Sequence, residues 1–493
     1  MTGRTRFQQR PAGIHAAGWG WRHAGRAAWA VRGLDLDVQP GERILLLGGS
    51  GSGKSTLLGG IAGVLGGDDD GESEGRLLLD GEAPSAVRGR AGLVLQDPET
   101  QTVLARVGDD VAFACENIGV PREQIWPRVR AALDAVRLDV DLSHATSALS
   151  GGQKQRLALA GILAMQPGVL LLDEPTANLD PDGVVEVRDA VASALEATGA
   201  TLIVVEHRVD VWLELVDRVV VLDGAGGVLA DGAPDRVFDD SARELRAAGV
   251  WLPHRSAPAR REPTAQGAAL LSGEGLTVAR PRGPRIPVGD ITVRAGTALA
   301  LTGVNGAGKS TLALALGGLL PPVSGTLTAS EELRAGLGAS PFAWRSSALV
   351  SRIGSVFQNP EHQFVAATVR DELAVGPRAA GIRRRQTDAV IDDVLARLRL
   401  DSLARANPFT LSGGQKRRLS VATAIVTAPR MLVLDEPTFG QDAVTWGELV
   451  GLLAELRDGG SALVCATHDE ELVRVLAAQR RELTAGAPLV GAA

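Results

Sequence analysis

The segment Gly48-Gly-Ser-Gly-Ser-Gly53-Lys54-Ser55 recurs in modified form as Gly303-Val-Asn-Gly-Ala-Gly308-Lys309-Ser310 in this 493-residue chain. Each copy follows a short apolar run and precedes an apolar helical pattern, which is the strand–loop–helix context of a phosphate-binding loop. Backbone N–H groups of such a loop point inward, and the helix N-terminus adds positive potential. The compact lysine ammonium fits inside the loop, whereas a planar guanidinium is too wide. The chain is therefore predicted to bind nucleotide phosphates twice.

Lysine is rare in this chain. It occurs four times, and the other 47 of the 51 basic residues are arginines. Lys54 and Lys309 lie in the glycine loops, while Lys154 and Lys416 directly follow two copies of Leu-Ser-Gly-Gly-Gln. No comparable geometric requirement is visible at the second pair, so we expect arginine to be tolerated there.

An internal duplication organises the chain. Gly303 follows Gly48 by 255 residues, and later motifs repeat at 261 or 262, which places a seven-residue insertion in the second half, within 328–347. We predict domains at 14–250 and 269–493, an N-terminal tail at 1–13 and a proline-containing linker at 251–268.

Both halves share one predicted order of elements: buried strand, glycine loop, apolar helix, helical region, signature helix and two further strands. The strands are predicted at 43–47, 169–172, 201–205, 298–301, 431–434 and 461–466, the helices from Ser55 and Ser310, and the helical regions at roughly 111–149 and 369–411. Uninterrupted apolar strands that alternate with helices indicate an α/β fold with a mainly parallel sheet in each half.

Composition excludes several classes of protein. The net charge of −7 gives no chain-wide basic field for nucleic acid. The run 383–385 is a short arginine patch with helical character and is predicted to be a solvated face. The two cysteines, Cys115 and Cys465, lie in different halves, which argues against a disulfide framework and fits a reducing compartment.

Membrane and export signals are not expected. The most apolar stretch, 157–172, is interrupted by Gln166-Pro167 and is too short to span a bilayer. Residues 1–13 are basic but lack the apolar core of a signal peptide. We therefore expect a chain that reaches a membrane only through partners.

Acidic pairs follow the second buried strand of each half, as Asp173-Glu174 and Asp435-Glu436. A carboxylate at this end of a parallel strand faces the nucleotide crevice, so Asp173 and Asp435 are predicted to hold Mg²⁺. Glu174 and Glu436 are predicted to orient the attacking water. Such pairs are often only helix caps, but their position after a phosphate loop in both halves favours the catalytic interpretation.

Four further polar residues repeat in register. His207 and His468 each end a strand and are predicted to contact the γ-phosphate in a supporting role. Gln96 and Gln358 follow apolar strands and are predicted to reach Mg²⁺ and the water. One such residue alone has little specificity, and the recurrence carries the prediction.

Leu149-Ser-Gly-Gly-Gln153 and Leu411-Ser-Gly-Gly-Gln415 each begin a predicted helix. A serine cap followed by two glycines exposes backbone N–H groups at the positive helix end, which suits a phosphate. A plain helix start is the alternative, but the full pentapeptide occurs twice, each time ahead of an acidic pair.

These motifs, in this order and twice over, resemble the ATP-binding cassette (ABC) ATPases across nearly the whole chain. The resemblance implies a P-loop core with an antiparallel β subdomain and an α-helical subdomain, and ATP and Mg²⁺ as ligands. In that family each ATP lies between one domain's P-loop and the other domain's signature.

The resemblance thus implies two sites. The first would use Gly48, Gly49, Ser50, Gly51, Ser52, Gly53, Lys54, Ser55, Thr56, Gln96, Asp173, Glu174 and His207, closed by Ser412, Gly413, Gly414 and Gln415. The second would use Gly303, Val304, Asn305, Gly306, Ala307, Gly308, Lys309, Ser310, Thr311, Gln358, Asp435, Glu436 and His468, closed by Ser150, Gly151, Gly152 and Gln153. Ser55 and Ser310 would join Gln96, Gln358 and the aspartates as Mg²⁺ ligands.

The two halves depart from the family pattern at two places. The adenine-stacking aromatic aligns with Trp21, beside Trp19, in the first half but with Arg280 in the second. The loop after the acidic pair is Asn178-Leu-Asp180 in one half and Gly440-Gln-Asp442 in the other. We therefore expect two hydrolytic sites, with room for unequal rates.

Several strings look like the energy-coupling-factor (ECF) importers of vitamins and metal ions. They are Gln96-Asp-Pro-Glu-Thr-Gln101, Gln358-Asn-Pro-Glu-His-Gln363, Val111-Ala-Phe-Ala-Cys-Glu-Asn117 and Asp435-Glu-Pro-Thr-Phe-Gly-Gln-Asp442. This likeness implies a transmembrane scaffold subunit near the glutamine loops, a membrane-embedded substrate-binding subunit, and a peripheral location on the cytoplasmic membrane face. The string 439–442 leans towards members linked to thiamine precursors.

Three alternatives use related ATPases. Tandem ribosome-acting factors typically carry a long basic linker, which this acidic chain lacks. Repair and chromosome ATPases need a large insertion between P-loop and signature, and the 95 residues from Lys54 to Leu149 leave no room for one. A tandem sugar-importer ATPase is the closer rival, distinguished by its membrane partners.

Overall fold

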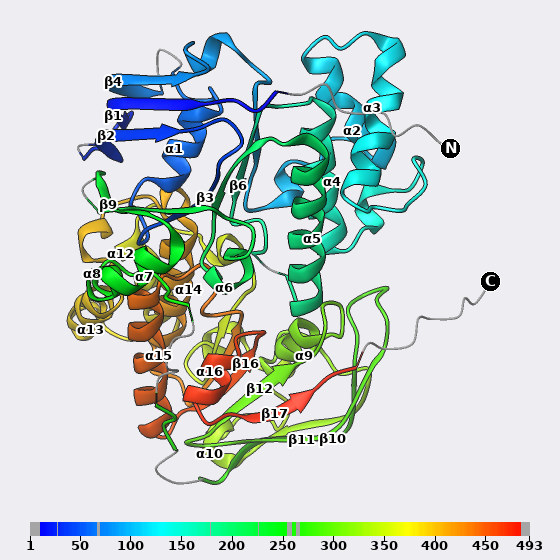
Figure 1. Ribbon diagram of the computed structural model, residues 1–493. Coiled ribbons are helices and arrows are strands. Elements are labelled where there is room, and N and C mark those ends of the chain that lie inside the picture. The colour runs from blue at the N-terminus through cyan, green and yellow to red at the C-terminus, as the bar shows by residue number, and fades with distance from the viewer. Residues whose placement is uncertain are drawn as a thin grey trace. The chain divides into compact units, whose positions relative to one another are not determined.

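The computed structural model describes residues 10–26, 28–66, 70–177, 179–224, 226–253, 259–262 and 267–484. The chain forms two compact units that divide near residue 255. We call the described residues up to 253 unit one and those from 259 onward unit two (Figure 1). Within the described ranges, no helix is both long and apolar enough to cross a membrane.

Unit one is built on a six-stranded sheet of order β5-β6-β7-β3-β8-β9, parallel except where β9 joins β8. Its strands are β3 (Arg43–Leu47), β5 (Ala91–Val94), β6 (Val169–Asp173), β7 (Thr201–Val205), β8 (Arg218–Leu222) and β9 (Val228–Gly232). Alternate residues of the central strands join two different cores: Ile44 and Leu46 pack on one face, and Leu45 and Leu47 on the other. Because both faces are covered, the strands are apolar without interruption.

One face of this sheet packs against α1 and a three-stranded antiparallel sheet of order β2-β1-β4, which lie side by side in Figure 1. These elements are β1 (Ile14–His23), β2 (Val31–Val38), β4 (Gly71–Leu79) and α1 (Lys54–Ile61). The other face is covered by helices. They are α2 (Val107–Asn117), α3 (Arg122–Ala135), α4 (Gly151–Ala164), α5 (Pro181–Thr198), α6 (Val209–Trp212), α7 (Pro234–Asp240) and α8 (Ala242–Ala247), with short 3-10 turns η2 (Pro98–Thr100) and η3 (Thr146–Ala148). A further 3-10 turn, η1 (Pro84–Ala86), lies beside β4.

Unit two repeats this plan with a five-stranded parallel sheet of order β14-β15-β16-β12-β17 and an antiparallel sheet of order β11-β10-β13. Its strands are β10 (Ala269–Val278), β11 (Ile286–Arg294), β12 (Ala298–Thr302), β13 (Ser324–Ala329), β14 (Ile353–Val356), β15 (Met431–Asp435), β16 (Ala462–Ala466) and β17 (Gln479–Glu482). Its helices are α9 (Lys309–Leu316), α10 (Glu331–Arg334), α11 (Ser346–Leu349), α12 (Val369–Ala379), α13 (Arg384–Arg397), α14 (Gly413–Ile425), α15 (Ala443–Asp458) and α16 (Glu470–Val475), with η4 (Pro341–Ala343), η5 (Pro360–Gln363), η6 (Asp401–Leu403) and η7 (Pro408–Thr410).

The predicted α/β fold is confirmed, and the six predicted strands agree with the observed ones to within one residue at each end. The stretch 328–347, where an insertion is predicted, contains α10, whereas unit one has only η1 between β4 and β5. The predicted helical regions are too long. In unit one α3 ends at Ala135, and Asp141 then forms a local turn by accepting from the backbone N of Ser143 (2.7 Å), which competes with the helix.

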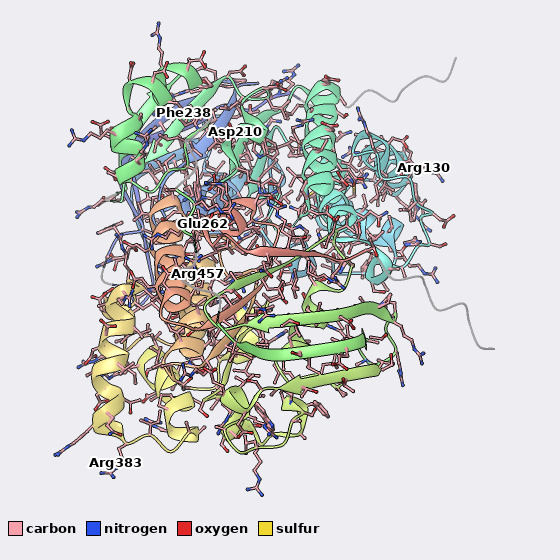
Figure 2. The ribbon with its side chains drawn as sticks, turned by 90° about the horizontal axis from the view of Figure 1, so that it is seen from below. Arg130, Asp210, Phe238, Glu262, Arg383 and Arg457 are labelled. Carbon is pink, nitrogen blue, oxygen red and sulfur yellow. The ribbon has the colours of Figure 1, made fainter. Side chains whose placement is uncertain are left out.

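Arginine occupies two opposite environments in unit two. Arg383 projects outward before α13 in Figure 2, as expected for the arginine run, and Arg385 is also exposed. Arg457 on α15 is 0% exposed. Its guanidinium donates to the backbone oxygens of Arg261 (2.8 Å) and Leu476 (2.5 Å) and to Asp458. It therefore fastens three segments of this unit together.

Replacing Arg457 with Ala should destabilise unit two by about 3 kcal/mol, because it leaves the buried backbone oxygen of Leu476 unpaired and a cavity where the fully buried side chain lay. Hydrogen–deuterium exchange of α15 measures this locally. Arg383→Ala is the matched control and should change protection by less than about 0.5 kcal/mol. Equal protection in the two variants would contradict the role given to Arg457.

Candidate functional site

The phosphate loop of unit one lies between β3 and α1. Gly53 precedes α1 with φ 89°, and a Cβ there would lie 2.4 Å from the backbone oxygen of Ala30, so only glycine fits. The Lys54 ammonium folds back onto the loop and donates to the backbone oxygens of Gly48 (2.8 Å) and Gly49 (3.0 Å). Burial lowers the pKa of Lys54, while the nearby Glu174 and Asp173 favour its charged form.

Unit two repeats the loop between β12 and α9. Gly308 has φ 99°, and a Cβ there would lie 2.2 Å from Cδ1 of Ile286. Lys309 Nζ donates to the backbone oxygens of Gly303 (2.8 Å) and Val304 (3.1 Å). Both lysines thus occupy the centre of their loop. The helix N-terminus adds its positive potential to that of the lysine, which makes the loop suitable for binding phosphates.

Two of the predicted Mg²⁺ ligands, the serine and the aspartate, come together in each unit. Asp173 is the last residue of β6 and Asp435 the last residue of β15. Ser55 donates its hydroxyl hydrogen bond to Asp173, and Ser310 does the same to Asp435. Burial raises the pKa of both aspartates, and these serines oppose that shift. A hydroxyl and a carboxylate beside a phosphate loop are the few protein oxygens that Mg²⁺ needs when phosphates supply the rest.

Glu174 is held from two sides. Its backbone is left-handed (φ 48°), a strained conformation for a non-glycine residue, and its N–H donates to the backbone oxygen of Val205 (2.9 Å). Gln96 Nε2 donates to Oε2 (2.7 Å), and His207 Nε2 lies 3.2 Å from Oε1. Burial alone would raise the pKa of Glu174, but His207, Lys54 and Gln96 outweigh it and lower the pKa. This carboxylate is therefore kept ionised.

Glu436 has the same left-handed backbone (φ 50°) but different neighbours. Thr467 Oγ1 donates to its Oε2 (3.1 Å). His468 Nε2 instead lies 2.8 Å from Lys309 Nζ and 3.0 Å from Asn305 Oδ1. Burial, followed by the charge of Asp435, raises the pKa of Glu436 to about 7. The two predicted bases thus sit in electrostatically unequal surroundings.

A carboxylate behind each site, buried in unit one and half-buried in unit two, was not predicted from the sequence. In unit one Glu206 accepts from the backbone N of Thr176 (2.9 Å) and from its hydroxyl, and burial raises its pKa. In unit two the corresponding Thr438 donates to Asp469 (2.7 Å). The carboxylate therefore precedes the histidine in one unit and follows it in the other. Its signal in the sequence was a charge next to each histidine.

The two signature segments begin helices as predicted. Ser150 Oγ accepts from the N–H of Gln153 (3.2 Å), and Gln153 Oε1 accepts from the N–H of Ser150 (2.9 Å). Ser412 and Gln415 form the same reciprocal box at the start of α14. These boxes fix the first turn of each signature helix.

The lysines beside the signatures have partners that the sequence did not reveal. Lys154 Nζ lies 2.6 Å from Glu99, and Lys416 Nζ lies 2.5 Å from Glu361. Both glutamates belong to the turn after the glutamine, in η2 and η5. Each pair therefore joins the glutamine loop to the signature helix of its own unit, at positions where an arginine could also reach the carboxylate.

The residues predicted to stack on adenine are placed differently in the two units. Trp21 is 4% exposed, and its ring packs in the core beneath the antiparallel sheet. Contrary to the prediction, it therefore presents no free ring face on which adenine could stack. The polar group at this position is His23, whose Nε2 lies 3.0 Å from Thr56 Oγ1 of the phosphate loop. Arg280 is exposed and its charge favours ionised Asp435.

The loops after the acidic pairs also differ. Leu179 is buried against Val184 and Val187, whereas Gln441 donates to the backbone oxygen of Gly414 (3.0 Å). Asn178 lies outside the described residues.

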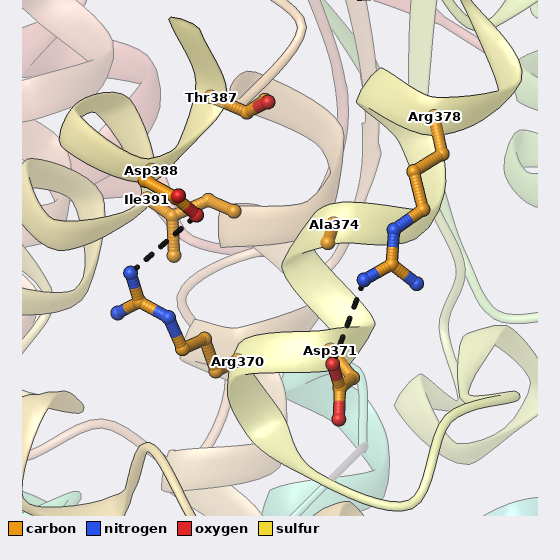
Figure 3. Close-up of a pocket in the computed structure, with 7 residues that line it drawn as sticks. All are labelled: Arg370, Asp371, Ala374, Arg378, Thr387, Asp388 and Ile391. Carbon is orange, nitrogen blue, oxygen red and sulfur yellow. Dashed lines mark ion pairs between the residues drawn. The ribbon is translucent and has the colours of Figure 1, made fainter. Parts of the chain in front are cut away.

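A small pocket in unit two lies between α12 and α13, away from the residues described above (Figure 3). It is lined by Arg370, Asp371, Ala374, Arg378, Thr387, Asp388 and Ile391. Arg370 pairs with Asp388 (3.7 Å) and Arg378 with Asp371 (3.6 Å). Because its charges are paired and none of its residues is a predicted ligand, this pocket is not the nucleotide site.

Comparison with known proteins decides the family. A family model described as "ABC transporter" matches residues 31–177 and 289–439, once in each unit. The chain belongs to the ABC transporter family. It is an ABC ATPase with two ATP-binding units, and its hydrolysis of ATP to ADP and phosphate is coupled to transport.

Relatives of this ABC ATPase match it across both units and over most of their own length. "Putative HMP/thiamine import ATP-binding protein YkoD" of Bacillus subtilis is 36% identical over 89% of this chain and 84% of its own. A "Putative ABC transporter ATP-binding protein" of Methanosarcina acetivorans is 32% identical over 90% of this chain and 80% of its own. The solved archaeal ribosome recycling factor aABCE1, in complex with a stalk protein, matches 93% of this chain and 86% of its own with a TM-score of 0.57 and 18% identity, which shows the fold alone.

Lys→Arg substitutions test the two classes of lysine in this ABC ATPase. Arginine at position 54 or 309 should lower ATP hydrolysis at least about a hundredfold, because the guanidinium is too wide for the buried loop centre. Lys154→Arg and Lys416→Arg are matched controls and should stay within about twofold. Steady-state phosphate release measures all four, and a similar loss in each would show that loop geometry is not what selects lysine.

Glu→Gln substitutions test the two candidate bases. Glu174→Gln and Glu436→Gln should each lower hydrolysis, and the double variant should lose about a thousandfold, because amides cannot take up a proton from the attacking water. The exposed Glu244 supplies the control substitution to Gln, which should leave turnover within about twofold. Near-normal turnover in the double variant would rule out both assignments.

Proposed function

We propose that this ABC ATPase is the energy-coupling subunit of an ECF-type importer for a vitamin, a vitamin precursor or a metal ion. The observation that carries the proposal is that each unit brings the lysine of its glycine loop close to the strand-end aspartate and to the buried glutamate that follows it. The Bacillus subtilis relative, matched over most of both chains, carries a name that refers to HMP/thiamine import. The glutamine-loop strings of the two units support the ECF assignment.

Each unit would act on ATP through its own residues. Lys54 exchanges its contacts with loop carbonyls for the outer phosphates, and Glu174, oriented by Gln96 and His207, takes up the proton as water attacks the γ-phosphorus. The bond from that phosphorus to the β,γ-bridging oxygen breaks, which releases ADP and phosphate. Ser55 and Asp173 would hold Mg²⁺, which supplies charge neutralisation on the phosphates.

We further propose that the signature of one unit completes the ATP site of the other. The support is the family resemblance together with the presence of both halves of each site in one chain. Ser150 and Gly151, like Ser412 and Gly413, are exposed at their helix starts, as a phosphate contact requires, whereas Gly152 and Gly414 are buried. Under this arrangement one chain carries two composite sites.

The importer would be completed by a transmembrane scaffold subunit and a membrane-embedded substrate-binding subunit, with this chain peripheral on the cytoplasmic face. An exposed valine follows the glutamine loop in both units: Val103 is 58% exposed and Val365 is 76% exposed. Beside Val365, Phe364 and the exposed Phe409 pack edge to face with ring centroids 6.0 Å apart. These apolar positions next to the glutamine loops suit a scaffold helix.

The alternative hypotheses are that the chain is a sugar-importer ATPase or a ribosome-acting factor. The likeness to a ribosome recycling factor is one of fold, and nothing in the charge of this chain favours ribosomal RNA.

Purification of the tagged chain from native membranes tests the proposal. Val103→Asp combined with Val365→Asp should reduce the recovered scaffold and substrate-binding subunits at least about fivefold, because a buried carboxylate disrupts an apolar contact. ATP hydrolysis by the isolated chain should remain within about twofold.

Val64→Asp is the matched control, since Val64 is 64% exposed but lies after α1, away from the glutamine loop. Ribosomes without integral membrane proteins among the recovered partners would overturn the importer assignment, and sugar-transporter subunits would replace it with the closer rival.

A further inference from the structure

Unit two contains a buried arginine near its catalytic centre that the hydrolytic residues leave unexplained. Arg417 lies on α14, two residues after the signature, and is 3% exposed. Its guanidinium donates to three backbone oxygens, those of Phe357 (2.8 Å), Gln358 (2.6 Å) and Asp435 (3.3 Å). Its Cζ also lies 5.9 Å from the ring centroid of Phe439.

These contacts join two parts of the site. Phe357 and Gln358 form the start of the glutamine loop after β14, and Asp435 ends β15 immediately before Glu436. A guanidinium is planar and directs its N–H groups in fixed directions, so it holds such carbonyls at set positions. Arg417 therefore fixes the glutamine loop relative to the strand that carries the acidic pair.

Unit one connects its glutamine loop to the acidic pair by a different contact. The corresponding residue is Gln155, which is neutral and 3% exposed, and among the described residues its side-chain nitrogen has no hydrogen-bond partner. There the glutamine loop reaches the base directly, since Gln96 donates to Glu174 (2.7 Å). In unit two Gln358 is held through its backbone oxygen, and Glu436 is held by Thr467.

Keeping a cation in this position is costly, which argues against an incidental substitution. Arg417 is 3% exposed, so its charge is withdrawn from water and is satisfied by the backbone oxygens that it contacts. A neutral glutamine fills the same place in unit one without loss of the fold. The charge and the planar fork thus serve something that glutamine does not provide.

We propose that Arg417 is the positioning residue of the second ATP site, holding the glutamine loop of unit two against Asp435 and Glu436 as the Gln96–Glu174 hydrogen bond does in unit one. It acts through Gln358 and touches no substrate. The site-specific consequence is that hydrolysis in unit two depends on an arginine that unit one does not need.

The test is Arg417→Gln, which installs the residue of unit one, in the full chain carrying Glu174→Gln so that unit two supplies the remaining hydrolysis. We expect kcat to fall about tenfold while KM for ATP and Tm change little, because the nucleotide contacts remain. Arg417→Lys keeps the charge but not the fork and should recover less than half of the lost rate. Arg430→Gln, at an exposed arginine of the same unit, is the control and should leave kcat within about twofold.

Site selectivity decides between positioning and general stability. In the Glu436→Gln background unit one supplies the remaining hydrolysis. There the fold reduction of kcat caused by Arg417→Gln should be at least fivefold smaller than in the Glu174→Gln background. An unchanged kcat in the first background, full recovery by lysine, or a parallel loss of Tm and of both rates in the Gln and Lys variants would each overturn the proposal.

Discussion

A pair of adjacent carboxylates at the buried end of one strand imposes the main constraint on each unit. Asp173-Glu174 and Asp435-Glu436 are largely withdrawn from water, and burial pushes the pKa of both aspartates upward. The surrounding structure supplies what water cannot. The lysine of the phosphate loop, a serine hydroxyl and polar groups from the neighbouring strand converge on each pair, at the point where the resemblance places Mg²⁺ and the γ-phosphate.

The two units meet that constraint with different side chains. In unit one a histidine and a glutamine contact the glutamate directly and lower its pKa. In unit two the histidine lies against the phosphate loop, a threonine holds the glutamate, and its pKa is raised to about 7. A buried arginine then connects the glutamine loop to the same strand. The two duplicated units therefore share the backbone conformation of the site but differ in the side-chain hydrogen bonds around the glutamate.

Much of the fold was predictable from the sequence because its signals are local. Parallel strands covered on both faces need continuous apolar runs, and β3, β7 and β15 follow such runs closely. The antiparallel sheets were implied only by the family resemblance, because Gly18 and Gly33, both with positive φ, interrupt the alternation of β1 and β2. The helical regions were overextended because the turn at Asp141 depends on a single side chain. Trp21 was expected at the adenine because alignment gives its position along the strand but not its depth in the core.

The motif residues were predictable from the sequence because their requirements are local. A left-handed glycine, a serine cap and a lysine at a loop centre each meet a conformational or steric requirement that arises within a few residues. Their partners were set by packing. Glu99 meets Lys154 across 55 residues, Arg417 meets Gln358 across 59, and Thr176 meets Glu206 across 30. Nothing in a linear pattern specifies which buried donor will face which acceptor, because burial and direction arise only when strands and helices pack. The sequence thus predicted an ATPase with two sites, and the packed structure decided that the surroundings of the two acidic pairs are not alike.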